Sequence, residues 1–274
     1  MMLLLVAGAA ALVAPGSRPS GAVACRGAAY DYCVQALGCT AAEATKAERR
    51  IMPNIAEWIT FARIEESCAW LQSSLDLSDA ELKKMVLTFP QMLSLSVEDN
   101  MAPKLDWLQT RLVLDDAQLK KMVLTFPHML GLSVEDNMAP KLDWLQTRLD
   151  LDDLGLRKMV LAFPALLTYS VEDNMQPKLG FYEEELGLSL SEMRASIVAA
   201  PNRLNYSLKT RFRPRLEVCR AAGVDASLVL SYATIVDEKF CKRAGVPLEA
   251  LRAAQETDSP SPSRSMGYVS PLRS

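Results

Sequence analysis

Apolar residues recur along the chain with the spacing of buried helical faces. Between Leu82 and Phe89 they follow the i, i+3, i+4, i+7 order of one face of an α-helix. The preceding Ser78-Asp79-Ala80-Glu81 segment has the residues of a capping box, in which an N-cap hydroxyl and an N3 carboxylate satisfy free backbone N–H groups. Pro90 should end this helix, because the residue before a proline avoids the α region. The pattern predicts a helix over residues 79–89.

A second amphipathic run follows almost at once. Ser96 and Asp99 again give an N-cap and an acidic N3, and the run after them places Met101, Leu105 and Leu108 on one face. Pro103 should kink this helix or mark its true start, since an interior proline removes a hydrogen bond and clashes with the preceding turn. The sequence therefore predicts a unit of two helices, joined by a short connector that begins at Pro90.

This unit repeats every 37 residues. Two series of prolines have that spacing: Pro90, Pro127, Pro164 and Pro201, and Pro103, Pro140, Pro177 and Pro214. Residues 80–116 and 117–153 differ at only four of 37 positions, which indicates a recent duplication. Because a two-helix unit cannot bury its apolar stripe alone, successive copies must stack. We predict an all-α fold, a superhelical α-solenoid of about four full repeats over residues 79–226, with degenerate capping repeats at residues 53–70 and 224–243.

The two ends of the chain have different compositions. Residues 1–15 are almost wholly apolar, and residues 1–30 contain two arginines and no acidic residue, which is typical of a targeting segment. The apolar run is too short to span a bilayer, so no membrane anchor is expected in the mature protein. The C-terminal segment from residue 256 is rich in serine and proline, a composition that is typical of disorder. We predict a targeting segment at 1–40, the solenoid at 41–255, a disordered tail at 256–274, and import into a mitochondrion or a plastid.

Composition argues against catalysis. The 274-residue chain has one histidine, His128, and six cysteines without metal-ligand spacing. His128 stands where the sister copy has Gln91, so it is not a candidate general base. We predict that the protein is not an enzyme and takes no metal or other cofactor. The formal net charge is −3, so any nucleic acid must be held by a local concentration of cations.

The repeat supplies such a concentration. One repeat position carries a cation in four copies, Lys83, Lys120, Arg157 and Arg194, and another carries Lys104, Lys141, Lys178 and Arg215. Stacking would align each set into a row that matches a charged polymer. The fourth copy adds a cluster, Arg203, Lys209, Arg211, Arg213, Arg215 and Arg220, with only one acidic residue among them. We predict that these residues contact phosphates, with Tyr206 and Phe212 as candidates for base stacking. The alternative is that the lysines simply solvate exposed helix faces.

The motif Phe89-Pro90-x-Met92-Leu93, followed by Ser96-x-Glu98-x-Asn100-x-x-Pro103-Lys104-Leu105-x-Trp107-Leu108, occurs three times, and the third copy departs from it only at Leu166, Phe181 and Tyr182. It resembles the repeat of the mitochondrial transcription termination factor (mTERF) family. The stretch from Pro201 to Leu216 and the segment from Asp237 to Phe240 are similar to late repeats of plant and algal members. The resemblance covers about residues 53–243. It implies a left-handed superhelix of helical triplets, an organellar location, and binding of double-stranded DNA along a basic concave surface.

We predict an organellar protein that binds double-stranded DNA and acts in regulation of transcription or in transcription termination, with organellar gene-expression proteins as further candidate partners. Two alternatives stay open. One is binding of structured RNA in organellar RNA processing, because some members of the family act on RNA. The other is a helical-repeat scaffold for a protein partner, which the overall acidity favours. The salt dependence of binding separates a polyanion from a protein partner.

Overall fold

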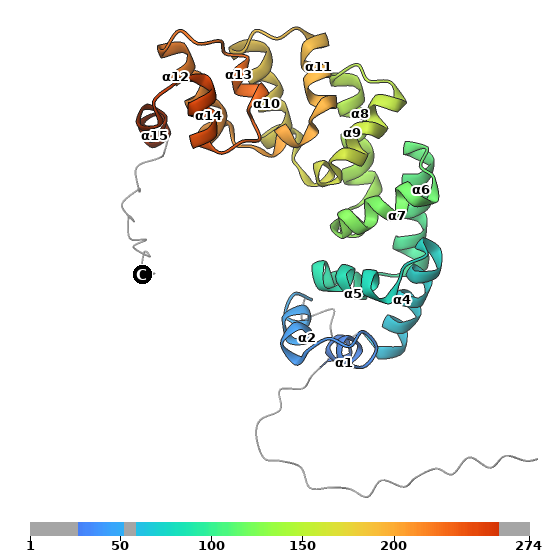
Figure 1. Cartoon of the computed structure of the whole chain (residues 1–274). Coiled ribbons are helices and arrows are strands. Elements are labelled where there is room, and N and C mark those ends of the chain that lie inside the picture. The colour runs from blue at the N-terminus through green and yellow to red at the C-terminus, as the bar shows by residue number, and fades with distance from the viewer. Residues whose placement is uncertain (1–26, 52–58, 258–274) are drawn as a thin grey trace, which may run out of the picture.

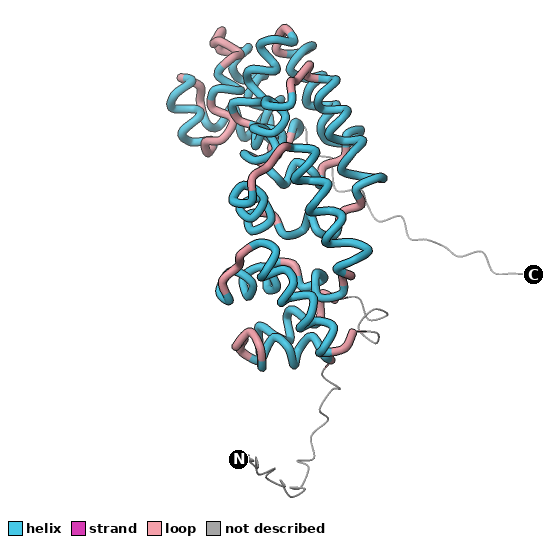
Figure 2. Tube along the Cα trace, turned by 90° about the vertical axis from the view of Figure 1, so that its right-hand side faces the viewer, coloured by secondary structure: helices cyan, strands magenta, loops and turns pink. Residues whose placement is uncertain are grey.

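The computed structural model describes residues 27–51 and 59–257, and within these two ranges every regular element is helical. The helices stack one after another into a curved chain, and short loops connect them (Figure 2). The all-α solenoid predicted from the repeat is confirmed. In Figure 1, α5 (Asp79–Thr88) and α7 (Asp116–Thr125) lie on the inner side of the curve, while α4 (Phe61–Leu75) and α6 (Ala102–Leu112) lie on the outer side.

Each repeat consists of a first α-helix, a 3-10 turn that begins at proline, and a second helix that opens with a π-helical turn. The first repeat has α5, η1 (Pro90–Ser94), η2 (Val97–Met101) and α6. The second has α7, η3 (Pro127–Gly131), η4 (Val134–Met138) and α8 (Ala139–Arg148). The third has α9 (Asp153–Ala162), η5 (Pro164–Thr168), η6 (Val171–Met175), α10 (Gln176–Gly180) and η7 (Phe181–Glu185). The fourth has α11 (Leu190–Ala199), η8 (Pro201–Asn205), η9 (Leu208–Phe212) and α12 (Arg213–Ala221).

The second proline of each repeat explains the π-helical turn. Pro103 has no N–H, and its ring would collide with the carbonyl four residues earlier in a regular α-helix. The chain instead widens just before the proline: Met101 N–H donates to the Ser96 carbonyl at 3.0 Å, and Ala102 N–H donates to the Val97 carbonyl. The α-helix proper then begins at Ala102. Pro103 therefore marks its start, as the sequence predicts.

The helix faces predicted to be apolar form the core. Leu82, Met85 and Val86 are buried on α5, and Leu105 and Leu108 are buried on α6. The capping box predicted at Ser78 and Glu81 is present, and equivalent boxes open the first helices of the second and fourth repeats. The tryptophans of the second helices are half-buried and pack against this core. One continuous cluster of apolar side chains thus links the repeats from end to end.

Helices outside the four repeats cover the two ends of the stack. At the N-terminal end they are α1 (Ala28–Gln35), α2 (Ala41–Glu48) and α4; at the C-terminal end they are α13 (Leu228–Ser231), α14 (Asp237–Ala244) and α15 (Leu248–Thr257). α1 corrects the predicted domain limits, because it falls inside the segment assigned to targeting. Its Tyr30, Tyr32 and Cys33 are buried, and the helix packs against α2 and α4. The folded unit therefore includes residue 28.

The remaining predicted end segments fall outside the described residues. These are the apolar leader within residues 1–26 and the Ser/Pro-rich tail within residues 258–274. Pro53, taken as the start of a degenerate repeat, also lies outside them. The predicted beginning of the tail at residue 256 overlaps the last turn of α15.

One helix end carries a strained residue. Val113 follows α6 in the left-handed conformation, with φ of 50°, and its side chain is 65% exposed. The same position is Asp76 after α4 and Asp150 after α8, both also left-handed. A β-branched residue is unfavourable there, whereas aspartate tolerates this conformation.

We expect Val113→Asp to raise the free energy of unfolding by about 1 kcal/mol, because the left-handed strain is relieved and almost no apolar burial is lost. The matched variant Asp76→Val should lower it by a similar amount, since the exposed Asp76 side chain makes no hydrogen bond or ion pair within the described ranges. Urea denaturation of the two variants and the wild type measures both values. If Val113→Asp leaves the protein no more stable, the strain at this helix end is not real.

Candidate nucleic-acid interface

Three lysines predicted to contact phosphate are buried between repeats. Lys104 is 4% exposed, and its ammonium group donates to the backbone carbonyl of Leu130 in the next repeat and to Asn100 Oδ1 at 2.8 Å. The same contact joins Lys141 to the Leu167 carbonyl and Lys178 to the Leu204 carbonyl. We call these three contacts the lysine clamps. The predicted phosphate contacts of Lys104, Lys141 and Lys178 are wrong, because each amine is enclosed and already bound to oxygen.

Burial has a clear effect on these amines. Removal from water lowers the pKa of Lys104 and of Lys178 to about 8, and it lowers the pKa of Lys141 in the same direction. Glu135 opposes the effect at Lys104. A buried ammonium group is tolerated only where oxygen atoms surround it. Each buried lysine therefore requires the carbonyl of the following repeat to stay within hydrogen-bond distance of its ammonium group.

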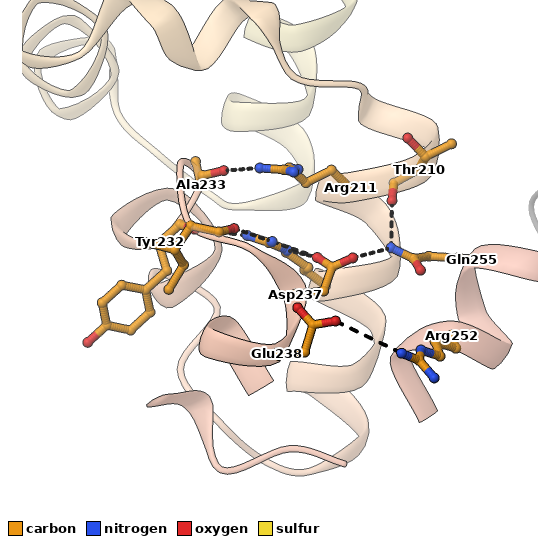
Figure 3. Close-up of polar contacts among 10 residues, drawn as sticks. Thr210, Arg211, Tyr232, Ala233, Asp237, Glu238, Arg252 and Gln255 are labelled. Atoms are coloured by element: carbon orange, nitrogen blue, oxygen red, sulfur yellow. Dashed lines mark hydrogen bonds and ion pairs between the residues drawn. The ribbon is translucent and has the colours of Figure 1, made fainter. Parts of the chain in front are cut away.

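Arg215 takes the place of the lysine in the fourth repeat, and it is fully buried. Its guanidinium group donates to the carbonyls of Tyr232 at 2.8 Å and Ile235 at 2.7 Å, and to Asp237 Oδ1 at 2.6 Å. Figure 3 shows Asp237 with its second contact, from Gln255 Nε2 at 3.0 Å. Burial alone would raise the pKa of Asp237, but the hydrogen bonds from Arg215 and Gln255 outweigh it and lower that pKa. Arg215 fastens the last repeat to the terminal helices. Its predicted phosphate contact is wrong for the same reason as for the lysines.

The other predicted row also links repeats, although its members are only half-buried. Lys83 Nζ donates to the Gly38 carbonyl at 2.8 Å, Lys120 Nζ to the Asp76 carbonyl, and Arg157 Nη1 to the Val113 carbonyl at 2.9 Å; Arg194 Nη2 pairs with Asp150 Oδ2 at 2.7 Å. Every acceptor lies at the C-terminal end of an earlier helix, where backbone carbonyls favour a cation. These four side chains are bound within the solenoid and present only part of their surface.

The arginine-rich cluster of the fourth repeat divides into bound and exposed members. Arg203 Nη1 donates to the Ser196 carbonyl at 2.7 Å, and Arg211 Nη1 donates to the Ala233 carbonyl at 2.8 Å while its guanidinium group lies over Tyr206. Both arginines are half-buried. Tyr206 is thus already covered by a cation.

Three members of the cluster are exposed. Arg213 pairs with Glu185 at 3.0 Å, Arg220 donates to the Glu185 carbonyl at 2.7 Å, and Lys209 has no ion pair in the described part of the chain. Phe212 is fully buried, so its predicted stacking role is wrong. Of the six cluster residues, Lys209, Arg213 and Arg220 remain accessible to a ligand.

A row of free lysines was missed by the sequence reasoning. Lys84, Lys121 and Lys158 occupy one repeat position on α5, α7 and α9, one residue after the predicted row. All three are exposed, and within residues 27–51 and 59–257 their amines have no hydrogen-bond or ion-pair partner. The fourth copy has Ala195 here. We call these three residues the free lysine row.

A groove of about 550 Å³ connects two members of this row. Lys84 and Thr88 of α5 line one side, and Lys120, Lys121 and Thr125 of α7 line the other. No carboxylate lines this groove, although Lys120 also pairs with Glu81 at 3.2 Å. Both helices lie on the inner side of the curve (Figure 1). A groove between α9 and α11 is lined by Asp150 and Asp152 beside Arg194, so it has carboxylates where the groove between α5 and α7 has none.

Other kinds of site find little support in the described residues. Their histidine, cysteine, aspartate and glutamate side chains form no group of three that could hold a metal ion. None of the described helices has the length and apolar character needed to cross a bilayer.

Comparison with known proteins identifies the repeat. A family model described as mTERF matches residues 50–154 and 74–240. A comparison with curated proteins finds no match. The matched region contains all four repeats, both rows of bound cations and the free lysine row.

The free energy of unfolding distinguishes a clamp lysine, such as Lys104, from a lysine of the free row, such as Lys84. We expect Lys104→Met to lower the free energy of unfolding by about 1–3 kcal/mol, because it leaves the Leu130 carbonyl buried without a donor. Lys84→Met should change it by less than about 0.5 kcal/mol, because the side chain is exposed and unpartnered. Chemical denaturation compares the two variants. Equal effects would show that Lys104 is not a clamp.

Proposed function

Because the chain belongs to the mTERF family, whose helical-repeat proteins bind nucleic acid and act in transcription-related regulation, we propose that it binds double-stranded DNA through the free lysine row. In this proposal, binding affects transcription or its termination in an organelle. Proteins of this family are generally organellar and generally non-enzymatic. Mitochondrion and plastid are both compatible with the composition of the N-terminal residues.

The observation that carries the proposal is the repetition of unpaired amines at Lys84, Lys121 and Lys158. Nucleic-acid phosphates recur at regular intervals, so a stack of equivalent lysines offers one charge per repeat to the same backbone. Binding costs little at these residues, because no existing ion pair has to break. The groove between α5 and α7 adds Lys120 to the same surface.

A duplex fits this surface better than an unpaired strand. Single strands are usually held by exposed aromatic side chains on which bases stack. Here Phe212 is buried, Trp107 and Trp144 are half-buried against the core, and Tyr206 is covered by Arg211. Contacts through amines alone position the phosphate backbone without reading bases. The proposal therefore predicts weak sequence preference.

Lys209, Arg213 and Arg220 extend the proposed interface at the C-terminal end. They are exposed, and two of them contact Glu185. A phosphate would compete with that carboxylate for Arg213. These residues are therefore secondary contacts in the proposal, and the free lysine row is primary.

The decisive experiment measures affinity for duplex DNA as a function of salt. The triple variant Lys84→Gln, Lys121→Gln and Lys158→Gln should bind more weakly, and the slope of log K against log salt should fall by about 3, since each lost phosphate contact removes about 0.9. The control exchanges three other exposed lysines for glutamine: Lys46, Lys239 and Lys242. It has the same net charge and should bind like the wild type.

Parallel titrations with duplex RNA and single-stranded DNA identify the preferred ligand. The proposal expects duplex DNA to bind most tightly. Preference for duplex RNA would move the function to RNA processing. An unchanged salt slope in the triple variant would remove the free lysine row from the interface.

A further inference from the structure

A second surface of the solenoid carries unpaired negative charge. Six exposed carboxylates open the second helices of three successive repeats: Glu98, Asp99, Glu135, Asp136, Glu172 and Asp173. Their side chains accept hydrogen bonds from the serine that caps the same turn, and none forms an ion pair in the described ranges. Helix capping accounts for their presence, and the buried Lys104 and Lys141, which Glu135 and Glu172 attract, offset only part of the negative charge of the row.

These carboxylates line two equivalent grooves with a tryptophan in each. The first, of about 340 Å³, lies between η2–α6 and η4 and is lined by Asp99, Asn100, Trp107 and Glu135. The second, of about 420 Å³, has the same residue types one repeat later: Asp136, Asn137, Trp144 and Glu172. We call them the tryptophan grooves. None of the residues lining the basic groove between α5 and α7 lines either of them.

Each tryptophan groove offers three kinds of contact. The tryptophan lines the groove, so a cation bound there can contact the indole ring, and the two carboxylates can pair with that cation. Asn100 Oδ1 already accepts from Lys104 Nζ, so the amide N–H₂ group remains available to donate. Lys104 and Lys141 also line the two grooves, where Glu135 and Glu172 attract them. Their ammonium groups are buried and bound to the carbonyls of Leu130 and Leu167, and one lysine against two carboxylates leaves each groove an excess of negative charge. An arginine or lysine side chain attached to a backbone carbonyl would satisfy all three contacts.

The series ends after two grooves. At the junction of the third and fourth repeats, Lys209 of the fourth repeat stands where Glu135 and Glu172 stand, and the buried Phe181 of the third repeat replaces the tryptophan. The acidic, aromatic chemistry is therefore confined to the junctions between the first and second repeats and between the second and third.

We propose that the two tryptophan grooves bind an extended, arginine- or lysine-rich segment of a partner protein, with one basic side chain in each groove. Successive helices pack about 8–10 Å apart, and an extended chain rises about 3.3 Å per residue, so basic residues about three positions apart would reach both grooves. Nucleic acid is a poor occupant because the carboxylates repel phosphate. The surface would leave the free lysine row open, so the protein could join a basic partner to DNA.

The test uses the full chain and a labelled peptide of repeated Arg-Gly-Ser triplets. The quadruple variant Asp99→Asn, Glu135→Gln, Asp136→Asn and Glu172→Gln should weaken peptide binding about tenfold or more, as expected from the loss of several ion pairs. The matched control exchanges four other exposed carboxylates for glutamine: Glu65, Glu66, Glu184 and Glu249. It should bind as the wild type does. Equal weakening in the two variants would overturn the proposal, as would undiminished binding by the first.

Two further arms separate the groove from general attraction of charge. Trp107→Leu with Trp144→Leu should weaken the peptide while circular dichroism shows the helices intact, and the free lysine row variant should bind it normally. A peptide with arginine at every sixth position should bind more weakly than the triplet peptide.

Two outcomes would overturn the proposal. If spermine displaces the triplet peptide as well as the unlabelled peptide does, the grooves bind any polycation and have no specificity for a protein segment. Tighter binding by a peptide of residues 258–274 would assign the grooves to the protein's own tail. Either result overturns the assignment to a partner protein.

Discussion

The hydrogen bond from a buried lysine to a carbonyl oxygen of the next repeat is the contact on which the stack depends. Lys104, Lys141 and Lys178 each make it at the same repeat position, and Arg215 makes an enlarged version to the terminal helices. Apolar burial brings the repeats together without fixing their relative position, because it is non-directional. A buried ammonium group requires its acceptors at defined places, since an unpaired charge is very costly in the interior. The clamps thus give the stack a defined register.

Each of the first three repeats also carries a lysine that is exposed and unpaired, next to a basic residue that is bound within the solenoid. Lys83 and Lys84 are adjacent, yet one binds the end of an earlier helix and the other is exposed without a partner. At about 100° per residue, Lys84 lies about 150° from the centre of the apolar face of its helix, and Lys83 about 110°. That difference places Lys83 against the neighbouring repeat and Lys84 in solvent. The proposed binding surface therefore follows from the helical period.

Much of the fold could be predicted from the sequence, because the 37-residue period, the prolines and the capping residues each have a local physical meaning. The exposure of Lys104, Lys141, Lys178 and Arg215 was predicted wrongly, because a repeat period shows which residues are equivalent but not which way they point. The signal for Lys104 was present: Met101, Lys104, Leu105 and Leu108 have the i, i+3, i+4, i+7 spacing of one face. Helix α1, with its buried Tyr32, could not be predicted from the sequence, because it is only eight residues long and follows a stretch with the composition of a targeting segment. Contacts such as that of Arg215 with Asp237 join distant segments and could not be found from spacing.

The account depends on the separation of clamped lysines from free ones, and lysine side-chain NMR tests it most directly. In a ¹⁵N-lysine-labelled protein, with signals assigned by single substitutions, duplex DNA should shift the amine signals of Lys84, Lys121 and Lys158. The signals of Lys104, Lys141 and Lys178 should stay in place and show slow exchange with water. Shifts at the second group with none at the first would contradict the account.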